Sequence, residues 1–277
     1  MSSNVEQRYL QLMKNALSFS LWPEPPIPIE TFNVLRPPHK RIVVKMISRL
    51  FKLIDWHVVS DRHFGDDDRN EGRKWPGYAH TMIGLKRLDN IQSSIETVLR
   101  EDIAGDFIET GVWRGGACIF MRAVLAAHDI EDRTVFVADS FEGLPKPDEQ
   151  WPEDKDDRLH ENRFLAVSQS EVENNFRKYG LLDDQVCFLK GWFKDTLPTA
   201  PIDSLSVMRL DGDMYGSTMD ALSNLYPKLS RGGFCIIDDY NAKGCGCHKA
   251  VNDFRARHDI KSPLKEIDWA SVFWRKE

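Results

Sequence analysis

The sequence predicts an α/β fold in which a mostly parallel sheet carries helices on both faces. From about Leu88 onward, short apolar runs alternate with segments of helical periodicity. Several of these runs end in a carboxylate, which is typical of strands whose carboxyl ends face a ligand crevice. The last two runs are separated by too few residues for a helical crossover, so we expect an antiparallel pair at one edge.

Composition excludes several classes of function. The 277 residues are 42% hydrophobic and 29% charged, with 37 Lys and Arg against 43 Asp and Glu, which gives a net charge of −6. Sequence-independent binding of nucleic acid needs a basic excess, and this chain has none. We find no apolar core of a signal peptide and no apolar stretch near the ~20 residues that cross a bilayer, so we expect a soluble cytoplasmic protein without membrane partners. The five cysteines lie largely in apolar runs, which indicates reduced core residues.

Residues 1–80 form an N-terminal extension that is Pro-rich and helical, and residues 81–277 form the main domain. Six prolines between Leu21 and Pro38 predict an extended segment. His39 to Ile54 has helical apolar spacing with interspersed Lys and Arg, which indicates an amphipathic helix packed on the domain or on a partner subunit. A membrane-surface helix is the alternative. The acidic segment from Asp61 to Lys74 is expected to be a solvated loop, and a metal site at residues 66–68 is its alternative.

The elements of the main domain follow in order. Helical periodicity predicts helices at residues 88–101, 115–129, 168–180, 217–233 and 248–259. The fourth of these ends at Gly232-Gly233, a common C-terminal stop. Apolar runs predict strands at residues 105–111, 134–140, 185–191, 205–213 and 234–240, and the closing pair at 264–268 and 271–277.

Six carboxylates stand at the carboxyl ends of predicted strands. In doubly wound sheets, ligands bind beyond these ends, so we expect the side chains to surround one crevice. They are Glu109, Asp139, Asp211, Asp213, Asp238 and Asp239.

The first strand–helix loop favours a nucleoside ligand that lacks a diphosphate. Gly111 permits a tight turn, and Gly115 and Gly116 allow a ligand to approach the backbone. Trp113 occupies the place of the second glycine of a dinucleotide fingerprint and would obstruct a pyrophosphate. Asp139 ends the next strand, where an acidic side chain can accept hydrogen bonds from ribose hydroxyls.

The remaining acidic pairs predict a cation site. "RLDGD" supplies Asp211 and Asp213, and "IIDDY" supplies Asp238 and Asp239. An oxygen-only ligand set favours Mg²⁺ or Ca²⁺. Cys245 and Cys247 lack a second cysteine pair, which argues against zinc.

Six motifs in order resemble one family. "FIETGVWRGGA", "VADSFEGLP", "GWFKDTLP", "RLDGDMYGST", "IIDDY" and "GCHKAVNDFR" resemble the macrocin O-methyltransferase (TylF-type) family from about Thr81 to the C-terminus. The resemblance implies a class I methyltransferase (Rossmann-like) fold with a seven-stranded, mostly parallel sheet and an antiparallel last strand. It also implies S-adenosylmethionine and Mg²⁺ as cofactors.

The resemblance assigns roles to individual residues. Glu109 and Gly111 would meet the methionine part of S-adenosylmethionine, Asp139 the ribose, and Ser140 with the Gly191–Trp192 turn the adenine or ribose. The expected cofactor-binding set is completed by Met82, Thr110 and Gly115.

Asp211, Asp238 and Asp239 would bind magnesium. A lysine serves related catechol enzymes as base after the first metal aspartate, but Met214 and Tyr215 stand there in this chain. Asp211 is therefore the first candidate for the general base, and His160 or Glu161 is the reserve.

The implied reaction is methyl transfer from S-adenosylmethionine to a sugar hydroxyl of a glycosylated natural product, with Mg²⁺ orienting and acidifying that hydroxyl. The polar insertion from Lys146 to Phe164 is expected to be the lid that selects the acceptor. The expected partner is thus a small glycoside, and the proline-rich extension suggests a homo-oligomer. Two alternatives remain: a metal-dependent glycosyltransferase that uses the Asp-x-Asp motif, and a non-catalytic binding protein.

Overall fold

A seven-stranded sheet is the centre of the computed structural model, which describes residues 4–32 and 36–277. Its strands are β3 (Asp106–Thr110), β4 (Val135–Asp139), β5 (Val186–Lys190), β6 (Leu205–Leu210), β7 (Leu229–Ile237), β8 (Lys265–Glu266) and β9 (Val272–Arg275). They lie side by side in the order β5-β4-β3-β6-β7-β9-β8. Neighbours from β5 to β7 pair in parallel, and β9 runs antiparallel to β7. This arrangement confirms the predicted mostly parallel sheet with an antiparallel last strand.

The predicted antiparallel pair at one edge is confirmed as β8 and β9. β9 lies between β7 and β8 and pairs antiparallel with both, so the edge strand β8 runs parallel to the first five. β9 carries Val272 and Trp274, which are buried, whereas both residues of β8 are exposed. Burial of the apolar strand inside the sheet leaves the short charged strand to cover the edge.

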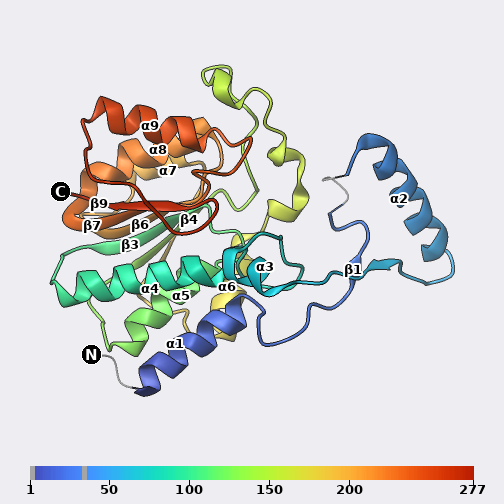
Figure 1. Cartoon of the computed structure of the whole chain (residues 1–277), viewed down its shortest axis with the longest axis horizontal. Coiled ribbons are helices and arrows are strands. Elements are labelled where there is room, and N and C mark those ends of the chain that lie inside the picture. Colours follow the sequence, from blue (N-terminus) through green and yellow to red (C-terminus); the bar gives the residue numbers. More distant parts are fainter. Residues whose placement is uncertain (1–3, 33–35) are drawn as a thin grey trace.

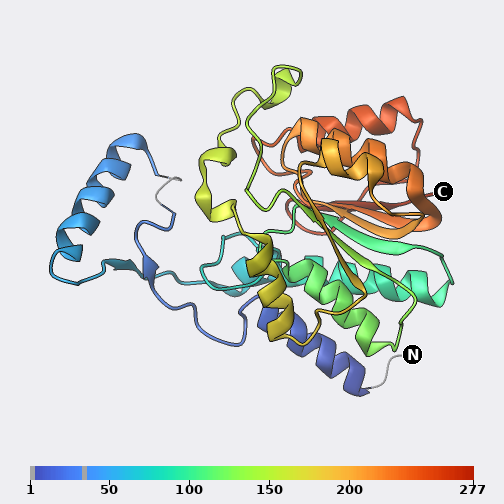
Figure 2. The same ribbon diagram turned by 180° about the vertical axis from the view of Figure 1, so that it is seen from behind.

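Helices cover both faces of the sheet (Figures 1 and 2). On one face lie α4 (Leu85–Arg100), α5 (Gly116–Ala127) and α6 (Gln169–Lys178); on the other lie α7 (Phe193–Thr196), α8 (Tyr215–Leu225) and α9 (Cys247–Arg257). The five helices predicted from periodicity are present as α4, α5, α6, α8 and α9. The predicted end of the fourth is wrong, because α8 ends at Leu225 and Gly232-Gly233 lies within β7. Among residues 4–32 and 36–277, no helix combines the length and apolar character needed to cross a membrane.

The first helix belongs to this body. α1 (Asn4–Leu17) packs on α4 and α5, and its Leu10 and Leu17 are fully buried. The boundary at residue 80 stays a prediction, but α1 contributes to the core of the main domain.

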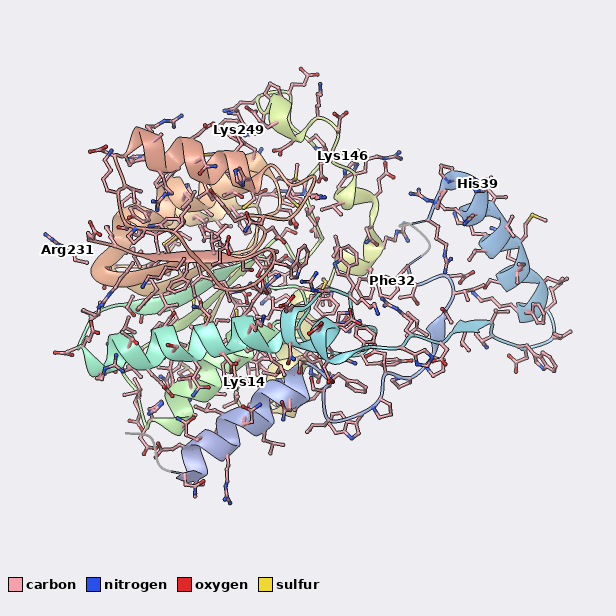
Figure 3. The ribbon with its side chains drawn as sticks, viewed as in Figure 1. Lys14, Phe32, His39, Lys146, Arg231 and Lys249 are labelled. Atoms are coloured by element: carbon pink, nitrogen blue, oxygen red, sulfur yellow. The ribbon has the colours of Figure 1, made fainter. Side chains whose placement is uncertain are left out.

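Residues 27–32 and 36–60, which we call the arm, stand away from the body (Figure 1). β1 (Ile27–Pro28) and β2 (Val59–Ser60) pair antiparallel at its base, and α2 (Pro38–Lys52) forms its outer part. Figure 3 shows the side chains of α2 projecting into the open, with His39 at its N-terminal end. The expected amphipathic helix is present, but Ser48 is the one buried residue of α2, all of whose residues the structure describes. The predicted packing of this helix on its own domain is therefore wrong.

The acidic segment expected to be a loop contains a short helix, α3 (Asp66–Glu71). The Asp68 carboxylate accepts a hydrogen bond from the Gly65 N–H (2.9 Å) and caps the helix. Lys74 donates to the same carboxylate at 2.6 Å, and Gly72 ends the helix in the left-handed conformation. Local capping thus overrides the loop-like composition.

The insertion between β4 and α6 contains three short 3₁₀ turns, at Pro152–Asp154, Leu159–Glu161 and Arg163–Leu165. Its anchor is Asp154, whose side chain is buried and accepts hydrogen bonds from the N–H groups of Tyr215 (2.7 Å) and Gly216 (2.9 Å). These are the first N–H groups of α8, so the insertion caps that helix.

Candidate active site

The strand-end carboxylates do gather at one edge of the sheet, because β3, β4, β6 and β7 are parallel and end on the same side. Two cavities lie there. Both reach the loop after β3 and the residues that follow β6, and the residues they share are Met82, Gly111, Trp113, Leu165, Asp211 and Asp213.

The first cavity contains most of the predicted cofactor-binding set. It is lined by Met82, Gly111, Asp139, Ser140, Gly191 and Trp192, together with insertion residues that include Lys146 and Trp151. Glu109, Thr110 and Gly115 are not among the described residues that line it.

Gly111 is required by the close approach of two loops. Its φ of 82° is left-handed, and a Cβ at this position would overlap the carbonyl oxygen of Asp211. The Asp211 N–H donates to the Thr110 carbonyl at 2.9 Å, which fixes the two strand ends against each other. Gly111 therefore lets the loop after β3 and the loop after β6 meet.

Asp139 joins the end of β4 to the loop that follows β3. One carboxylate oxygen accepts a hydrogen bond from the Val112 N–H (2.8 Å), and the other accepts one from the Phe141 N–H (2.7 Å). Burial raises the pKa of Asp139, although these backbone donors oppose the shift. The carboxylate is thus held in a fixed orientation at the wall of the first cavity.

Asp211, Asp213 and Asp239 form an acidic cluster. In the described part of the chain, one carboxylate oxygen of each lies within 4.8 Å of those of the other two. Burial and the charges of Asp211 and Asp238 raise the pKa of Asp213 to about 8. Burial and neighbouring carboxylates also raise the pKa values of Asp211 and Asp239. The cluster therefore carries repulsion that a cation would relieve.

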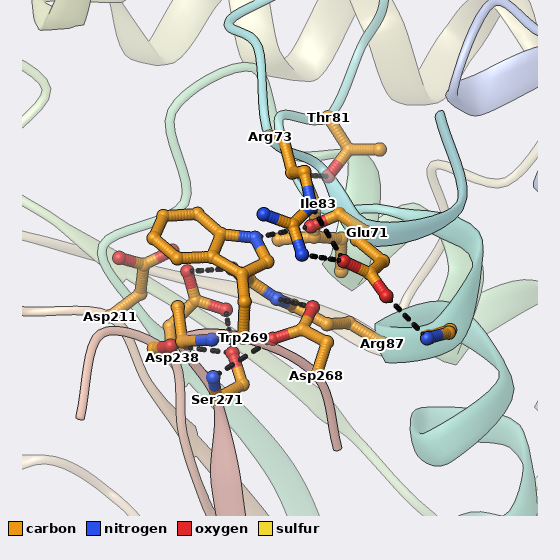
Figure 4. A network of polar contacts seen from close by, with 12 residues as sticks. Glu71, Arg73, Thr81, Ile83, Arg87, Asp211, Asp238, Asp268, Trp269 and Ser271 are labelled. Carbon is orange, nitrogen blue, oxygen red and sulfur yellow. Dashed lines mark hydrogen bonds and ion pairs between the residues drawn. The ribbon is translucent and has the colours of Figure 1, made fainter. Parts of the chain in front are cut away.

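Asp238 lies outside this cluster, in a buried ion-pair network (Figure 4). One carboxylate oxygen contacts Arg209, and the other accepts a hydrogen bond from Arg87 at 2.8 Å. Burial alone would raise the pKa of Asp238, but the two guanidinium groups hold that pKa below its ordinary value. Asp238 and Asp239 follow the last residue of β7 in a bend, and their contacts differ: Asp238 pairs with the two arginines, whereas Asp239 lies in the acidic cluster. The predicted ligand Asp238 is thus held by arginines, and Asp213 takes the third place in the cluster.

Glu109 is part of the same network. Its carboxylate contacts Arg209 on one side and accepts a hydrogen bond from the Cys118 thiol (3.0 Å) on the other. Arg209 also reaches Asp211 at 3.1 Å. One buried guanidinium therefore links the end of β3 to the acidic loop after β6.

The second cavity has an aromatic wall. It is lined by Trp75, Trp113 and Trp269, with Glu109, Arg209 and the acidic residues at its floor. The Trp269 Nε1–H donates to the Glu71 carbonyl at 2.8 Å, which holds the indole against the end of α3 (Figure 4). A flat, partly polar ring ligand suits such a wall.

A match to a protein-family model identifies the family of this chain. The macrocin-O-methyltransferase (TylF) model matches residues 6–276, nearly the whole chain. The chain belongs to the macrocin O-methyltransferase (TylF) family. It is an O-methyltransferase, so the alternatives of a glycosyltransferase and of a non-catalytic binding protein are wrong.

Named relatives agree with the TylF assignment. An 8-demethyl-8-(2,3-dimethoxy-alpha-L-rhamnosyl)-tetracenomycin-C 4'-O-methyltransferase from Streptomyces olivaceus is 50% identical over 277 residues, covering 99% of this chain and 95% of that protein. A demethyldecarbamoylnovobiocin O-methyltransferase from Streptomyces niveus is 56% identical over 219 residues, covering 78% of this chain and 83% of that protein. The solved structure of the O-methyltransferase NovP matches with a TM-score of 0.83 and 47% identity, over 98% of this chain and 99% of that chain.

The reserve bases lie apart from the acidic cluster of this TylF-family enzyme. Glu161 accepts hydrogen bonds from Arg158 at 2.9 Å. The His160 Nδ1 is buried and has no hydrogen-bond partner among the described residues. Neither His160 nor Glu161 is among the described residues that line the two cavities.

Sequence reasoning missed Arg209, Arg87, Trp75 and Trp269. The signal for Arg209 was available, because an arginine inside the apolar run "LSVMRL" must be paired when it is buried. The tryptophans gave no local signal, since they lie in segments without periodicity and reach the site only through long-range packing.

Proposed function

We propose that this TylF-family enzyme transfers the methyl group of S-adenosylmethionine to a sugar hydroxyl of a glycosylated natural product, with Mg²⁺ held at the acidic cluster. The observation that carries the proposal is the meeting of two cavities at Asp211 and Asp213. Methyl transfer needs the donor carbon and the acceptor oxygen in line at close range, and one cavity for each supplies this alignment.

The first cavity suits the methyl donor. Asp139 is oriented to accept hydrogen bonds from ribose hydroxyls, and Gly191 and Trp192 border the same space. Trp113 contributes to the wall where a pyrophosphate would have to approach the loop. A nucleoside without a diphosphate fits this arrangement.

The second cavity suits a sugar ring. Its tryptophan wall can cover the apolar face of the ring, while the acidic floor can accept hydrogen bonds from hydroxyls. The relative from Streptomyces olivaceus is named for a rhamnosyl acceptor, and its 50% identity supports a glycoside acceptor for this chain.

The acidic cluster fits a divalent cation. Burial and mutual repulsion raise the pKa values of its carboxyl groups, and its oxygens match the preference of Mg²⁺. Asp211 and Asp239 are the proposed ligands, and Arg87 and Arg209 hold Asp238 beside them. A bound Mg²⁺ would lower the pKa of an acceptor hydroxyl.

Asp213 is the best-placed proton acceptor. It lines both cavities, as Asp211 does. Asp211 additionally receives a hydrogen bond from Arg209 at 3.1 Å, which occupies one of its carboxylate oxygens, whereas Asp213 has no arginine partner among the described residues. Asp213 therefore replaces Asp211 as the first candidate for the base.

Calorimetry and a mass-detected assay test the proposal. S-adenosylhomocysteine should bind, and a nucleotide diphosphate sugar should not compete with it. Glycosides incubated with S-adenosylmethionine and Mg²⁺ should gain one methyl group, and EDTA should abolish the gain. Methylation that survives complete removal of metal would contradict the cation role, and competition by the nucleotide sugar would contradict the assignment of the first cavity.

A further inference from the structure

A cationic cavity lies at the base of the arm, between the paired strands β1 and β2 and the segment that follows α3. Its volume is about 420 Å³, which is within the range of small-molecule sites. Among its described lining residues none is Asp or Glu, and the Lys and Arg residues are Arg36, Arg62, Arg73 and Lys74. The side chains that line this cavity therefore carry charge of one sign.

Two of these cations have anionic partners, and two do not. Arg73 and Lys74 pair with carboxylates that do not line the cavity. Arg36 and Arg62 form no ion pair with a residue that the structure describes, and the Arg36 Nε is buried without a hydrogen-bond partner there. Two guanidinium groups in the same cavity therefore lack a counterion, and a bound anion would supply one.

Arg62 is fixed in a position that keeps its charge at the cavity wall. Its Nη1–H donates to the Trp75 carbonyl at 2.5 Å, and its guanidinium lies 4.5 Å from the centre of the Phe32 ring. Burial lowers the pKa of Arg62, although the charge of Glu24 opposes this shift. An anion in the cavity would favour the charged form, and the oxygens of a carboxylate match the planar donors of arginine.

Aromatic rings make up another part of the cavity wall. Phe32 and Trp75 line the cavity. Phe164 packs against both rings, with ring centres 4.7 Å and 6.1 Å away respectively. Aromatic side chains provide flat apolar surface, so a flat ring that carries an ionised group fits this wall better than a small hydrated anion does.

Trp75 connects the cationic cavity to the second cavity, because it lines both. The aromatic contacts continue from Phe164 to Trp113, whose ring centre is 5.4 Å away and whose Nε1–H donates to the Phe164 carbonyl at 2.9 Å. Trp113 also lines the second cavity. A molecule whose sugar occupies the second cavity can therefore extend past Trp75 into the cationic cavity.

We infer that the cationic cavity binds the aglycone of the methyl acceptor, a planar group that carries an ionised acid oxygen, with Arg36 and Arg62 as its counterions. This inference rests on the proposed function, in which the second cavity holds the sugar of the acceptor. It restricts the acceptor class to glycosides of planar acids.

Calorimetry on the full chain saturated with S-adenosylhomocysteine tests the cavity with naphthoate and with its neutral amide, naphthamide. Naphthoate should bind the wild type at least tenfold more tightly than naphthamide does. Arg36→Gln should weaken naphthoate binding at least fivefold, and Arg36→Gln/Arg62→Gln should weaken it further. Arg49→Gln is the matched control, because it removes the same charge from an exposed residue of the arm that does not line the cavity. Its naphthoate affinity should stay within twofold of the wild type.

Four results would overturn the inference: no measurable naphthoate binding, equal affinity for the acid and the amide, tighter binding of inorganic pyrophosphate than of naphthoate, or equal effects of Arg36→Gln and Arg49→Gln. If the double variant fails to fold, the single variant Arg36→Gln decides, because Arg36 has no ion pair to lose among the described residues.

A kinetic measurement separates failure of this inference from failure of the proposed function. The chain should methylate para-carboxyphenyl glycosides with a kcat/KM at least tenfold above that for para-carbamoylphenyl glycosides of the same sugars. Arg36→Gln should remove this preference by raising KM. Equal kcat/KM for the two glycosides in the wild type would overturn the inference. Methylation of neither glycoside would contradict the proposed function alone, and the naphthoate affinities would then decide whether the cavity binds planar acids.

Discussion

Asp238 and Asp239 are neighbours in the sequence, yet substitution of each should have a different effect. Asp239→Asn removes a charge from the acidic cluster, so it should weaken Mg²⁺ binding without lowering the metal-free unfolding free energy. Asp238→Asn leaves Arg209 and Arg87 without their shared carboxylate, and breaking a buried pair costs about 3–5 kcal/mol of unfolding free energy. Metal titration and urea unfolding of both variants measure the two effects. The opposite pattern would show that Asp238 is the principal ligand.

Asp213→Asn tests the proposed base. Methyl transfer should fall by about 10²–10⁴-fold, the usual contribution of a positioned proton acceptor, while S-adenosylhomocysteine affinity should stay within a few-fold. Asp211→Asn is the matched comparison, because Asp211 lines the same two cavities but is held by Arg209. If Asp213→Asn kept near-normal turnover at saturating Mg²⁺, the base would have to be sought at Asp211.

At the scale of elements, the insertion depends on its contact with α8. Asp154→Ala removes the acceptor for two N–H groups of that helix and should lower the unfolding free energy by about 0.5–2 kcal/mol. It should also make residues 146–164 easier to cleave by limited proteolysis. Asp156→Ala is the control, since Asp156 is an exposed aspartate of the same insertion. Equal proteolysis of the two variants would mean that Asp154 does not anchor the insertion.

Residues of the insertion line both cavities, the one proposed for the methyl donor and the one proposed for the acceptor. Lys146 and Trp151 line the first cavity, and Leu159 lines the second. The expectation of an acceptor lid is therefore incomplete, because the same segment reaches the space proposed for the donor. We expect trimming of the insertion to weaken S-adenosylhomocysteine binding as well as methylation, and calorimetry on the trimmed chain measures this.

At the scale of the whole molecule, the acidic cluster should make stability depend on pH and on metal. The folded-state pKa values of Asp211, Asp213 and Asp239 lie above their ordinary values, so their contribution to stability is fully present at low pH. It is lost as the pH rises through the folded-state values, about 8 for Asp213. In EDTA, the melting temperature should therefore fall between about pH 5 and pH 9, and saturating Mg²⁺ should reduce the fall. A metal-free melting temperature that rises across this range would contradict the raised pKa values.

The local pattern of the sequence determined the main elements. Alternating apolar runs and helical periodicity need only neighbouring residues. The strands β3 to β7, the helices α5, α6 and α8 between them and the strand-end carboxylates therefore followed from the local pattern. The family resemblance was likewise carried by short motifs and is confirmed over residues 6–276.

Tertiary structure decided the rest, because it depends on contacts between distant segments. Arg87 reaches Asp238 across 151 positions of the chain, and this contact assigns the two adjacent aspartates to different surroundings. Trp269 reaches the end of α3 across 198 positions and so closes one wall of the second cavity. The amphipathic spacing of α2 predicted a buried face but could not identify its cover. Periodicity records which side of an element avoids water, whereas the partner of that side is set by packing between elements that lie far apart in the sequence.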